Sequence, residues 1–464
     1  MTTTLEGVAG KATSIISSPD VMELFLRLLP REFVQAARQQ EGLRQNNRVY
    51  NDHVVMWLMI VQRLQGNGTL ERGVLELVRG LAEGFWLKPC KRLLQGPDGA
   101  KPLLSSNTGS YNEARRMLPL SVVEKCCDRA SEQLLQQTEG ACRQRRFLID
   151  GTTVRTAHSK SLAQQYPPAS NQHGESHWPV IRMLVAHDLE TGMALRPAWG
   201  PMYGDQAVSE QGLLEQLIDR LPGKAVVVGD INFGVFTVAC AATQQQHPVV
   251  LRMSKSRAYS LVRRELVDGM DERIVWRPTP FEKNQHPELP ADACVQGRLI
   301  VRQVQPSNTS EPILLMLFTT LEEPVEEVID IYGGRWNIEL DLRTLKSSLQ
   351  LDQLTSTTPE MVSKEIDIGM LAYNLVRAVM CMAALKAKLK PRQFSFTRVR
   401  NVLEVFTPLI AAAENEEQAE ELFDKMMYYV AQAKLASRKR TTNSYPRVAW
   451  GPPRVYPKHQ KPAA

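Results

Sequence analysis

The feature that most constrains the fold is a change of residue pattern near position 145. Before it, from about residue 20 to residue 140, apolar residues recur with the spacing of amphipathic helices, separated by Gly, Pro and Asn. After it come short apolar runs that are typical of strands: RRFLIDGTTV, KAVVVGDINFG and HPVVLRM. Their continuous apolar cores fit strands that are buried on both faces of a sheet. The chain is therefore predicted to combine a helical region with an α/β domain.

The chain has 464 residues, which is too long for one small core, and we expect it to divide into five segments. The pattern WPVIRMLVAHDLETGMALRPAWG predicts a β-hairpin, and SEQGLLEQLIDRLPG predicts a helix. Beyond the first turns after residue 252, strands without a clear helix are expected until about 322, and helices then return. The expected segments are an all-helical N-terminal domain that binds DNA (1–140), the first part of a mixed α/β domain (141–250), a β-rich insertion (251–322), the second part of the α/β domain (323–400) and a helical C-terminal region with a basic tail (401–464).

Composition favours a soluble protein of a reducing compartment. Apolar residues make up 43% of the chain and charged residues 23%, as in globular proteins. The seven Cys form no CxxC pair, and the N-terminus lacks the charged start and apolar block of a secretory signal, so we expect a cytoplasmic location. The apolar stretch 368–385 contains Asn374 and Arg377, and a central Arg costs about 2.5 to 3.5 kcal/mol in a spanning helix. A buried helix is expected there, with no membrane contact.

Positive charge is concentrated in two places, although the net charge is only +6. No acidic residue follows Asp424, whereas eight basic residues occur from Lys434 onward, and such an arm suits phosphate contact as well as a basic tail without a specific role. The segment NTGSYNEARRMLPL, with Arg115 and Arg116 facing outward, is compatible with a recognition helix in a helix-turn-helix-like arrangement. A simple packing helix is the alternative. The eight basic residues are Lys434, Arg438, Lys439, Arg440, Arg447, Arg454, Lys458 and Lys461.

The segment YGGRWNIELDLRTLK, residues 332–346, places a carboxylate between two cations. At about 100° per residue, Arg335, Glu339 and Lys346 fall within roughly 40° of one another on a helix. The apolar stripe of the same helix lies elsewhere, so this face is free to contact a ligand or, alternatively, to be a solvated face with i,i+4 pairs. Because glycines are unfavourable in a helix interior, the helix is expected to begin near Arg335, with Tyr332 on the turn before it. The stripe comprises Ile338, Leu342, Leu345 and Leu349.

Two aspartates end apolar runs, Asp150 in FLID and Asp230 in VVVGD. A carboxylate at a strand end stands at the rim of a sheet, where it faces a ligand or merely begins a turn. Together with Glu339 these residues would supply three oxygen ligands for hard divalent cations such as Mg²⁺. Two such ions about 3.5 to 4 Å apart support in-line displacement at phosphorus. Asp188 lies in the expected hairpin turn and Asp341 about 200° around the helix from Glu339, so neither is assigned to the cluster.

Four residues of the segment 332–346 match a known sequence signature. Tyr332, Arg335, Glu339 and Lys346 match the Y-(2)-R-(3)-E-(6)-K signature, so the chain resembles the bacterial DDE transposases of the insertion sequence four (IS4) family, and Asp150 and Asp230 look like the first two acids. The resemblance implies a ribonuclease-H-like mixed sheet flanked by helices and interrupted by a β-rich insertion. It also implies two Mg²⁺ or Mn²⁺ ions, metal-dependent DNA cleavage and strand transfer at terminal inverted repeats, and a homodimer on double-stranded transposon-end and target DNA.

The same resemblance suggests which side chains contact DNA. Tyr332, Arg335 and Lys346 would hold the phosphodiester backbone. Trp276, in RIVWRP, would stack on a base flipped at the transposon end, with a core Trp as the alternative. A ribonuclease-H-like nuclease or a domesticated descendant would carry the same acids. A DNA-binding regulator is the non-enzymatic alternative, and it has no use for a carboxylate among phosphate-facing cations.

Overall fold

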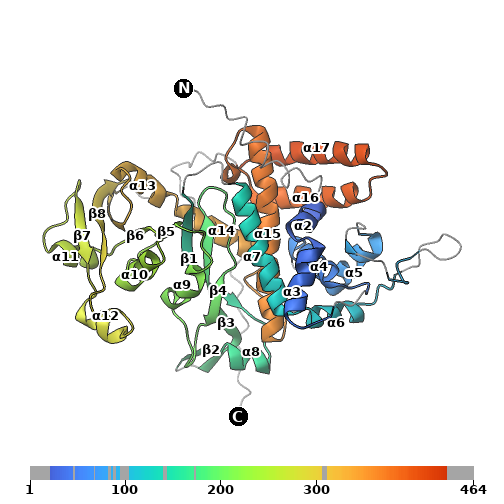
Figure 1. Cartoon of the computed structure of the whole chain (residues 1–464), viewed down its shortest axis with the longest axis horizontal. Coiled ribbons are helices and arrows are strands. Elements are labelled where there is room, and N and C mark those ends of the chain that lie inside the picture. The colour runs from blue at the N-terminus through green and yellow to red at the C-terminus, as the bar shows by residue number, and fades with distance from the viewer. Residues whose placement is uncertain are drawn as a thin grey trace, which may run out of the picture.

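One mixed sheet forms one side of the protein in a computed structural model, and a helical region forms the other side (Figure 1). The structure describes residues 21–44, 48–66, 68–81, 85–86, 90–94, 104–138, 144–171, 174–305 and 311–435. In these ranges nine strands follow the order β2-β3-β1-β5-β6-β9-β8-β7, with β4 paired to β3. The strands are β1 (Arg146–Arg155), β2 (Pro168–Asn171), β3 (Gly174–Asp188), β4 (Ala198–Pro201), β5 (Val226–Gly229), β6 (Val249–Arg252), β7 (Asp271–Trp276), β8 (Val295–Val304) and β9 (Ile313–Thr319).

The middle of the sheet is parallel, and its central strand β5 is fully buried. β1 pairs with β5, and β5 with β6, both in parallel. All four residues of β5 are buried, which explains why its sequence is a continuous apolar run. The expected hairpin is present, since β3 pairs antiparallel with both β1 and β4. Asp150 lies in the middle of β1 and not at its end, because residues 151–155 continue to pair with β3.

The strands of the expected insertion extend this same sheet. β9 pairs antiparallel with β6, and β8 and β7 follow it outward. The region also holds two short helices, α11 (Lys255–Val262) and α12 (Pro280–Gln285). The expectation that no helix follows the first turns is wrong at α12. This helix buries none of its residues and rests on a local capping box between Thr279 and Glu282, so it has no apolar periodicity to detect.

The long helix α15 (Pro359–Ala387) joins the sheet to the helical regions (Figure 1). It packs against N-terminal helices, including α4 and α7, and against the C-terminal pair α16 and α17. By length and composition it is apolar enough to cross a membrane, but 94% of its most apolar stretch is buried within the protein, as predicted. The other helices are α2 (Val21–Leu28), α3 (Arg31–Gln40), α4 (Asp52–Leu64), α5 (Leu70–Arg79), α6 (Gly109–Met117), α7 (Leu120–Gln137), α8 (Lys160–Gln165), α9 (Glu210–Ile218), α10 (Phe236–Gln244), α13 (Val325–Gly333), α14 (Trp336–Ser347), η3 (Pro391–Gln393), α16 (Phe396–Ala411) and α17 (Glu416–Gln432).

Two polar residues in the apolar part of α15, Asn374 and Arg377, bind the segment after β3 and helix α14. The Asn374 side chain accepts a hydrogen bond from the backbone N–H of Ala194 at 2.9 Å and donates one to its carbonyl at 2.7 Å. It therefore replaces the strand neighbour that the backbone of Ala194 would otherwise need. Arg377 forms a buried ion pair with Asp341 of α14. These contacts explain why an otherwise apolar helix carries an amide and a guanidinium at its centre.

A break between α13 and α14 sets the position of the signature residues. α14 begins at Trp336 with Arg335 at its N-cap, as predicted. Gly334 ends α13, and a Cβ there would lie 2.5 Å from Leu189 Cδ1, so the close approach requires glycine. Tyr332 lies in the last turn of α13 and not on a free turn, because α13 extends further than its glycines suggested.

Candidate catalytic site

Two adjacent strands bring Asp150 and Asp230 together. β1 and β5 run parallel, with Leu148 opposite Val228, so continuing the register by two residues places Asp150 opposite Asp230. Asp150 Oδ1 accepts a hydrogen bond from the N–H of Gly151 at 2.8 Å. Burial, together with the neighbouring negative charge of Asp230, raises the pKa of Asp150 to about 6. The carboxylates therefore lie near enough to repel one another.

Helix α14 presents the cationic residues and Glu339 to these aspartates. Its apolar side, which includes Ile338, is buried as predicted, so the polar face lies on the other side. A terminal nitrogen of Arg335 is 3.2 Å from Glu339 Oε1. Although burial opposes the charged form, the charges of Tyr332, Asp150, Asp230 and Glu339 raise the pKa of Arg335. The negative charges of all three predicted acids therefore act on Arg335.

Lys346 lies further along the same face of α14. Burial lowers its pKa, while the negative charges of Asp352 and Asp150 oppose that effect. The electrostatic influence of Asp150 on Lys346 shows that the lysine belongs to the same neighbourhood as the aspartates. Arg335 and Lys346 therefore both lie within electrostatic reach of Asp150, and Glu339 is paired with Arg335; that these residues act as one site stays a prediction.

The three acids do not form a closed metal cluster. Across the described ranges, no three His, Cys, Asp or Glu side chains are grouped so that they could hold a metal ion. Asp150 and Asp230 face one another, whereas Glu339 is held by Arg335. The donor set of carboxylate oxygens nevertheless fits a hard divalent cation. Asp150 and Asp230 are thus two candidate ligands side by side, and Glu339 is a third candidate that is paired with Arg335.

A fourth carboxylate, Glu210, lies beside the aspartates. It is the first residue of α9, after the N-cap Ser209, and it packs so closely on the backbone of Gly151 that a Cβ there would lie 2.0 Å from Glu210 Oε1. Burial and, to a smaller extent, Asp230 raise its pKa, with Arg182 opposing. The sequence gives no signal for this residue, because only the packing of α9 on the sheet brings it to the site.

Two buried polar atoms near Asp230 lack a hydrogen-bond partner in the described structure, namely Arg252 Nε and Tyr332 Oη. Arg252 is the last residue of β6, the neighbour of β5. Burial raises the pKa of Tyr332, and the charges of Arg335 and Arg252 oppose it. The run VVLR could have identified Arg252, since it ends a buried strand just as VVVGD does. Both groups can donate a hydrogen bond to a ligand at the rim of the sheet.

Trp276 is placed in the core. Its exposed fraction is 5%, and its ring lies edge to face against Phe318 at 4.8 Å and Phe236 at 6.0 Å between centroids. This burial contradicts the expected stacking on a flipped base, because a stacked base needs one exposed face of the ring. The alternation of RIVWRP did not show which face of β7 is covered. The indole of Trp336, at the start of α14, is by contrast 48% exposed.

The expected recognition helix, α6, has a different orientation from the predicted one. Arg116 points outward with 66% of its side chain exposed, but Arg115 turns inward and is only 12% exposed. α5 ends at Arg79 and α6 begins at Gly109, so no short turn joins them as in a helix-turn-helix motif. DNA contact by these arginines stays a prediction. Most of the basic arm, residues 436–464, lies outside the described residues.

Asp188 and Asp341 are structural, as expected. Asp188 Oδ1 accepts from the backbone N–H of Thr191 at 2.7 Å and so closes the hairpin turn, while its Oδ2 pairs with Arg145 at 3.0 Å. Asp341 is 1% exposed and pairs with Arg377 and with Arg392. The charges of these arginines hold the pKa of Asp341 below its usual range despite burial. Neither carboxylate is available to a ligand.

Comparison with known proteins identifies the region that contains the site. Residues 142–375 match a family model described as a transposase DDE domain. The chain is 26% identical over 255 residues to "Transposase InsG for insertion sequence element IS4" of Escherichia coli (strain K12), a match that covers 54% of this chain and 55% of that protein. The chain thus spans about half the length of the curated relative. A solved piggyBac transposase synaptic complex with hairpin DNA aligns with a TM-score of 0.40 and 10% identity, over 88% of this chain and 85% of the other.

Proposed function

This chain belongs to the DDE transposases of the IS4 family, and from that premise we propose that it cuts and joins DNA at the ends of its own insertion element. The supporting observation is the convergence of Asp150 and Asp230 on neighbouring strands with Arg335 and Glu339 of α14. In this proposal the central strands and helices act as a ribonuclease-H-like catalytic core. The substrates are the terminal inverted repeats and a double-stranded target, held by a homodimer of the chain.

The chemistry is proposed as two displacements at phosphorus. In the first, a water oxygen bonds to phosphorus, the bond to the 3′ oxygen breaks, and the released 3′ oxygen takes up a proton. In the second, that 3′-hydroxyl attacks a phosphodiester of the target, and the bond to a target 3′ oxygen breaks. Divalent Mg²⁺ or Mn²⁺, when bound, would lower the pKa of the attacking hydroxyl and stabilise the leaving oxygen.

The side chains of the site have separate roles in this proposal. Asp150, Asp230 and Glu339 would hold the cations through oxygen ligands, which is the chemistry that Mg²⁺ prefers. Arg335 and Lys346, on the same face of α14, would bind the oxygens of the cleaved phosphate. Tyr332 and Arg252 carry the unpartnered donors and would orient that phosphate. Arg335 would exchange its contact with Glu339 for the phosphate when substrate binds.

The test is cleavage of a duplex that carries the end of the element, with the inverted repeats read from the DNA that flanks the gene. Asp150→Asn, Asp230→Asn and Glu339→Gln should each abolish Mg²⁺-dependent cleavage while duplex binding is kept, and combining them should cause little further loss. Glu327→Gln is the matched control, since Glu327 is a surface carboxylate paired with Arg146. Near-parental cleavage by the Asp230 variant would disprove the assignment.

Strand transfer separates transposition from simple nuclease activity. A transposase should join the cut 3′ end to a second duplex, giving a product longer than either substrate. Cleavage without such a product would identify a nuclease or a domesticated descendant with the same acids. Mn²⁺ binding by calorimetry gives a readout independent of turnover, and it should be lost in Asp150→Asn but not in Glu327→Gln.

A further inference from the structure

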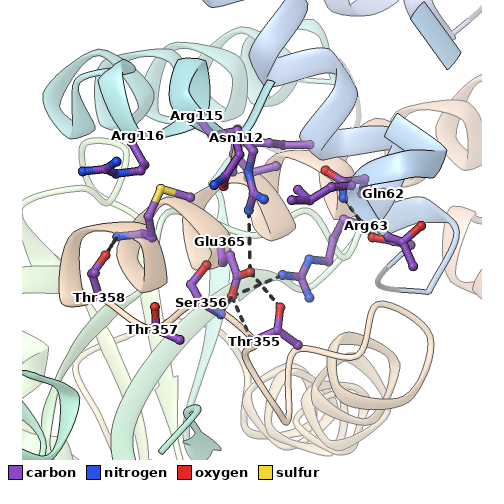
Figure 2. A pocket seen from close by; sticks show the side chains of 16 residues that line it. Gln62, Arg63, Asn112, Arg115, Arg116, Thr355, Ser356, Thr357, Thr358 and Glu365 are labelled. Carbon is purple, nitrogen blue, oxygen red and sulfur yellow. Dashed lines mark hydrogen bonds and ion pairs between the residues drawn. The ribbon is translucent and has the colours of Figure 1, made fainter. Parts of the chain in front are cut away.

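A cavity of about 620 Å³ lies where the N-terminal helices meet the loop that joins α14 to α15 (Figure 2). Its walls come from α4, the turn at 68–70, α6, residues 355–358 and the first turns of α15. These segments are far apart in the sequence and include none of the acids of the catalytic site. Figure 2 shows Arg115 reaching toward Glu365 from above and Arg63 from the right.

Positive charge exceeds negative charge inside this cavity. The side chains of Arg63 and Glu365 are each 5% exposed and that of Arg115 is 12% exposed. The two guanidinium groups share one carboxylate, which leaves a net charge of +1 among the three. Arg116 also lines the cavity but has its own partner, Glu113, on the surface at 3.0 Å. Buried charge without a close counter-charge is unfavourable, so the cavity favours an anion.

The contacts of both guanidinium groups are long. Arg63 is 3.7 Å and Arg115 is 3.9 Å from the Glu365 oxygens, whereas charge-assisted hydrogen bonds are usually about 2.7–2.9 Å. Arg63 also reaches two carbonyl oxygens at 3.4 Å, and Arg115 Nε is buried with no partner in the described structure. Several donors of two planar forks are therefore available to an anion with more than one oxygen.

Glu365 is used to hold the loop. Its carboxylate accepts hydrogen bonds from the N–H and hydroxyl of Thr355 at 3.3 and 3.2 Å and from the N–H of Ser356 at 3.4 Å. Lys364 donates to the last carbonyls of α6, those of Arg115 and Arg116, at 3.2 and 3.1 Å. The loop and α6 are both fixed to α15, so the two guanidinium groups face a preorganised space.

We propose that this cavity binds a backbone phosphate of the DNA that also occupies the catalytic site. Arg63 and Arg115 would hold the phosphate oxygens, and the hydroxyls of residues 355–358 would complete the contact. A second cavity of about 500 Å³ is lined by Lys346 and meets the first at Thr355. The two cavities together extend from Lys346, a residue of the signature, to α6. Such a continuous path suits a DNA strand better than a separate small phosphate compound. The inference rests on the proposed function.

The test measures duplex binding by fluorescence anisotropy at several salt concentrations, without divalent metal. Arg115→Gln should weaken binding and reduce the slope of log affinity against log salt by about 0.9, the value for one lost phosphate contact. Arg264→Gln is the matched control, because Arg264 is an exposed arginine, paired with Glu272, outside the cavity. It should leave the slope unchanged.

A second variant distinguishes the proposal from general damage to the fold. Glu365→Gln removes the carboxylate that competes for the two arginines, so duplex binding should become tighter and the salt slope steeper, by about 0.9. Loss of structure cannot strengthen binding. An unchanged slope in Arg115→Gln, or weaker binding in a folded Glu365→Gln variant, would overturn the proposal.

Inorganic phosphate serves as the small-molecule probe. If phosphate raises the melting temperature of the parent chain but not of Arg115→Gln, while the duplex slope is the same in both, the ligand is a small phosphate compound and the proposal is wrong. If the parent chain binds and cuts duplex DNA and Arg115→Gln does not change duplex binding, only the proposed role of the cavity is disproved. A parent chain that binds no duplex would overturn the proposed function as well.

Discussion

At the scale of single residues, the site is defined by charges that are imperfectly matched without a ligand. Asp150 lies beside Asp230 and close to Glu210, and burial and both negative charges raise its pKa. The positive charge of Arg335 lowers it. Three carboxylates thus lie together, with Arg335, Lys346 and Arg182 as their positively charged neighbours. Such a cluster destabilises the free protein and becomes favourable when cations bind.

This repulsion should be visible as a pH dependence of stability. The pKa of Asp150 in the folded protein, about 6, exceeds its ordinary value of 3.8, so the folded protein binds this proton more tightly than the unfolded chain does. The stability that protonated Asp150 contributes is therefore complete below about pH 4 and is lost as the pH rises through about 6. At about 1.4 kcal/mol per pKa unit, the loss is on the order of 2–3 kcal/mol.

Urea unfolding at about pH 4 and pH 7, without divalent metal, measures that loss. Asp150→Asn cannot ionise and should show a smaller decrease in the free energy of unfolding than the parent chain. Glu327→Gln, on the surface, should keep the parental decrease. An equal decrease in the parent chain and in Asp150→Asn would show that Asp150 is not held near Asp230.

Two tryptophans provide a second residue-scale prediction. Trp276→Ala should lower the free energy of unfolding by about 3–5 kcal/mol, since it removes a ring packed between Phe236 and Phe318. Trp336→Ala, at an exposed position, should change it by less than about 1 kcal/mol. Chemical denaturation of the two variants makes the comparison, and a stable Trp276→Ala protein would restore a ligand-binding role for that ring.

At the scale of elements, α14 is held in place by a buried ion network on the side that faces away from Glu339. Asp341 pairs with Arg377 of α15 and with Arg392 of η3. His187 of β3 lies 3.8 Å from the same carboxylate, and burial lowers the pKa of this imidazole to about 4. Helix α14 therefore carries two carboxylates that are two residues apart. Asp341 anchors the helix in the core, and Glu339 is the proposed ligand.

Asp341→Asn should lower the free energy of unfolding by about 3–5 kcal/mol, because two buried guanidinium groups lose their shared counter-charge. Glu339→Gln removes a partly exposed carboxylate from the same helix and should change it by less than about 1 kcal/mol. Guanidinium chloride titrations measure both. Similar losses in the two variants would contradict the distinction between an anchoring face and a ligand-binding face.

The sequence predicts the elements of the sheet better than it predicts what surrounds the acids. VVVGD and the 332–346 spacing are local patterns, so Asp230 and the face of α14 were correctly placed. Asp150 was expected at a strand end, but pairing with β3 extends β1 beyond it, and pairing is not a local property. Glu210 reaches Gly151 only through tertiary packing. Trp276 and Arg115 turn inward because distant segments cover them.

At the scale of the whole molecule, the helical region of residues 21–137 and the sheet depend on the same helix. α15 contacts α2, α4 and α7, while its Asn374 and Arg377 bind the β3 hairpin and α14. The buried apolar residues form one continuous cluster that includes residues of both regions. Although the chain divides by sequence pattern, its packing is continuous.

A fragment of residues 141–464 should therefore be less soluble than the full chain. Removing the N-terminal helices exposes the apolar surface of α15 that they cover, and large exposed apolar patches promote association. Size-exclusion chromatography should show aggregates, whereas the full chain should not give them. A monomeric fragment with a cooperative thermal transition would show that the helical region is an independent domain.

The late position of α15 also affects the order in which the protein is completed during synthesis. α7 ends at residue 137 and α15 at residue 387, so 250 residues separate them (387 − 137). At roughly 5–20 residues per second, a ribosome needs about 12–50 s to make that stretch. During this interval the apolar faces of α4 and α7 that α15 will cover have no partner. We therefore expect the nascent chain to need protection from association until α15 is made, and the rate of translation through the sheet sets how long that state lasts.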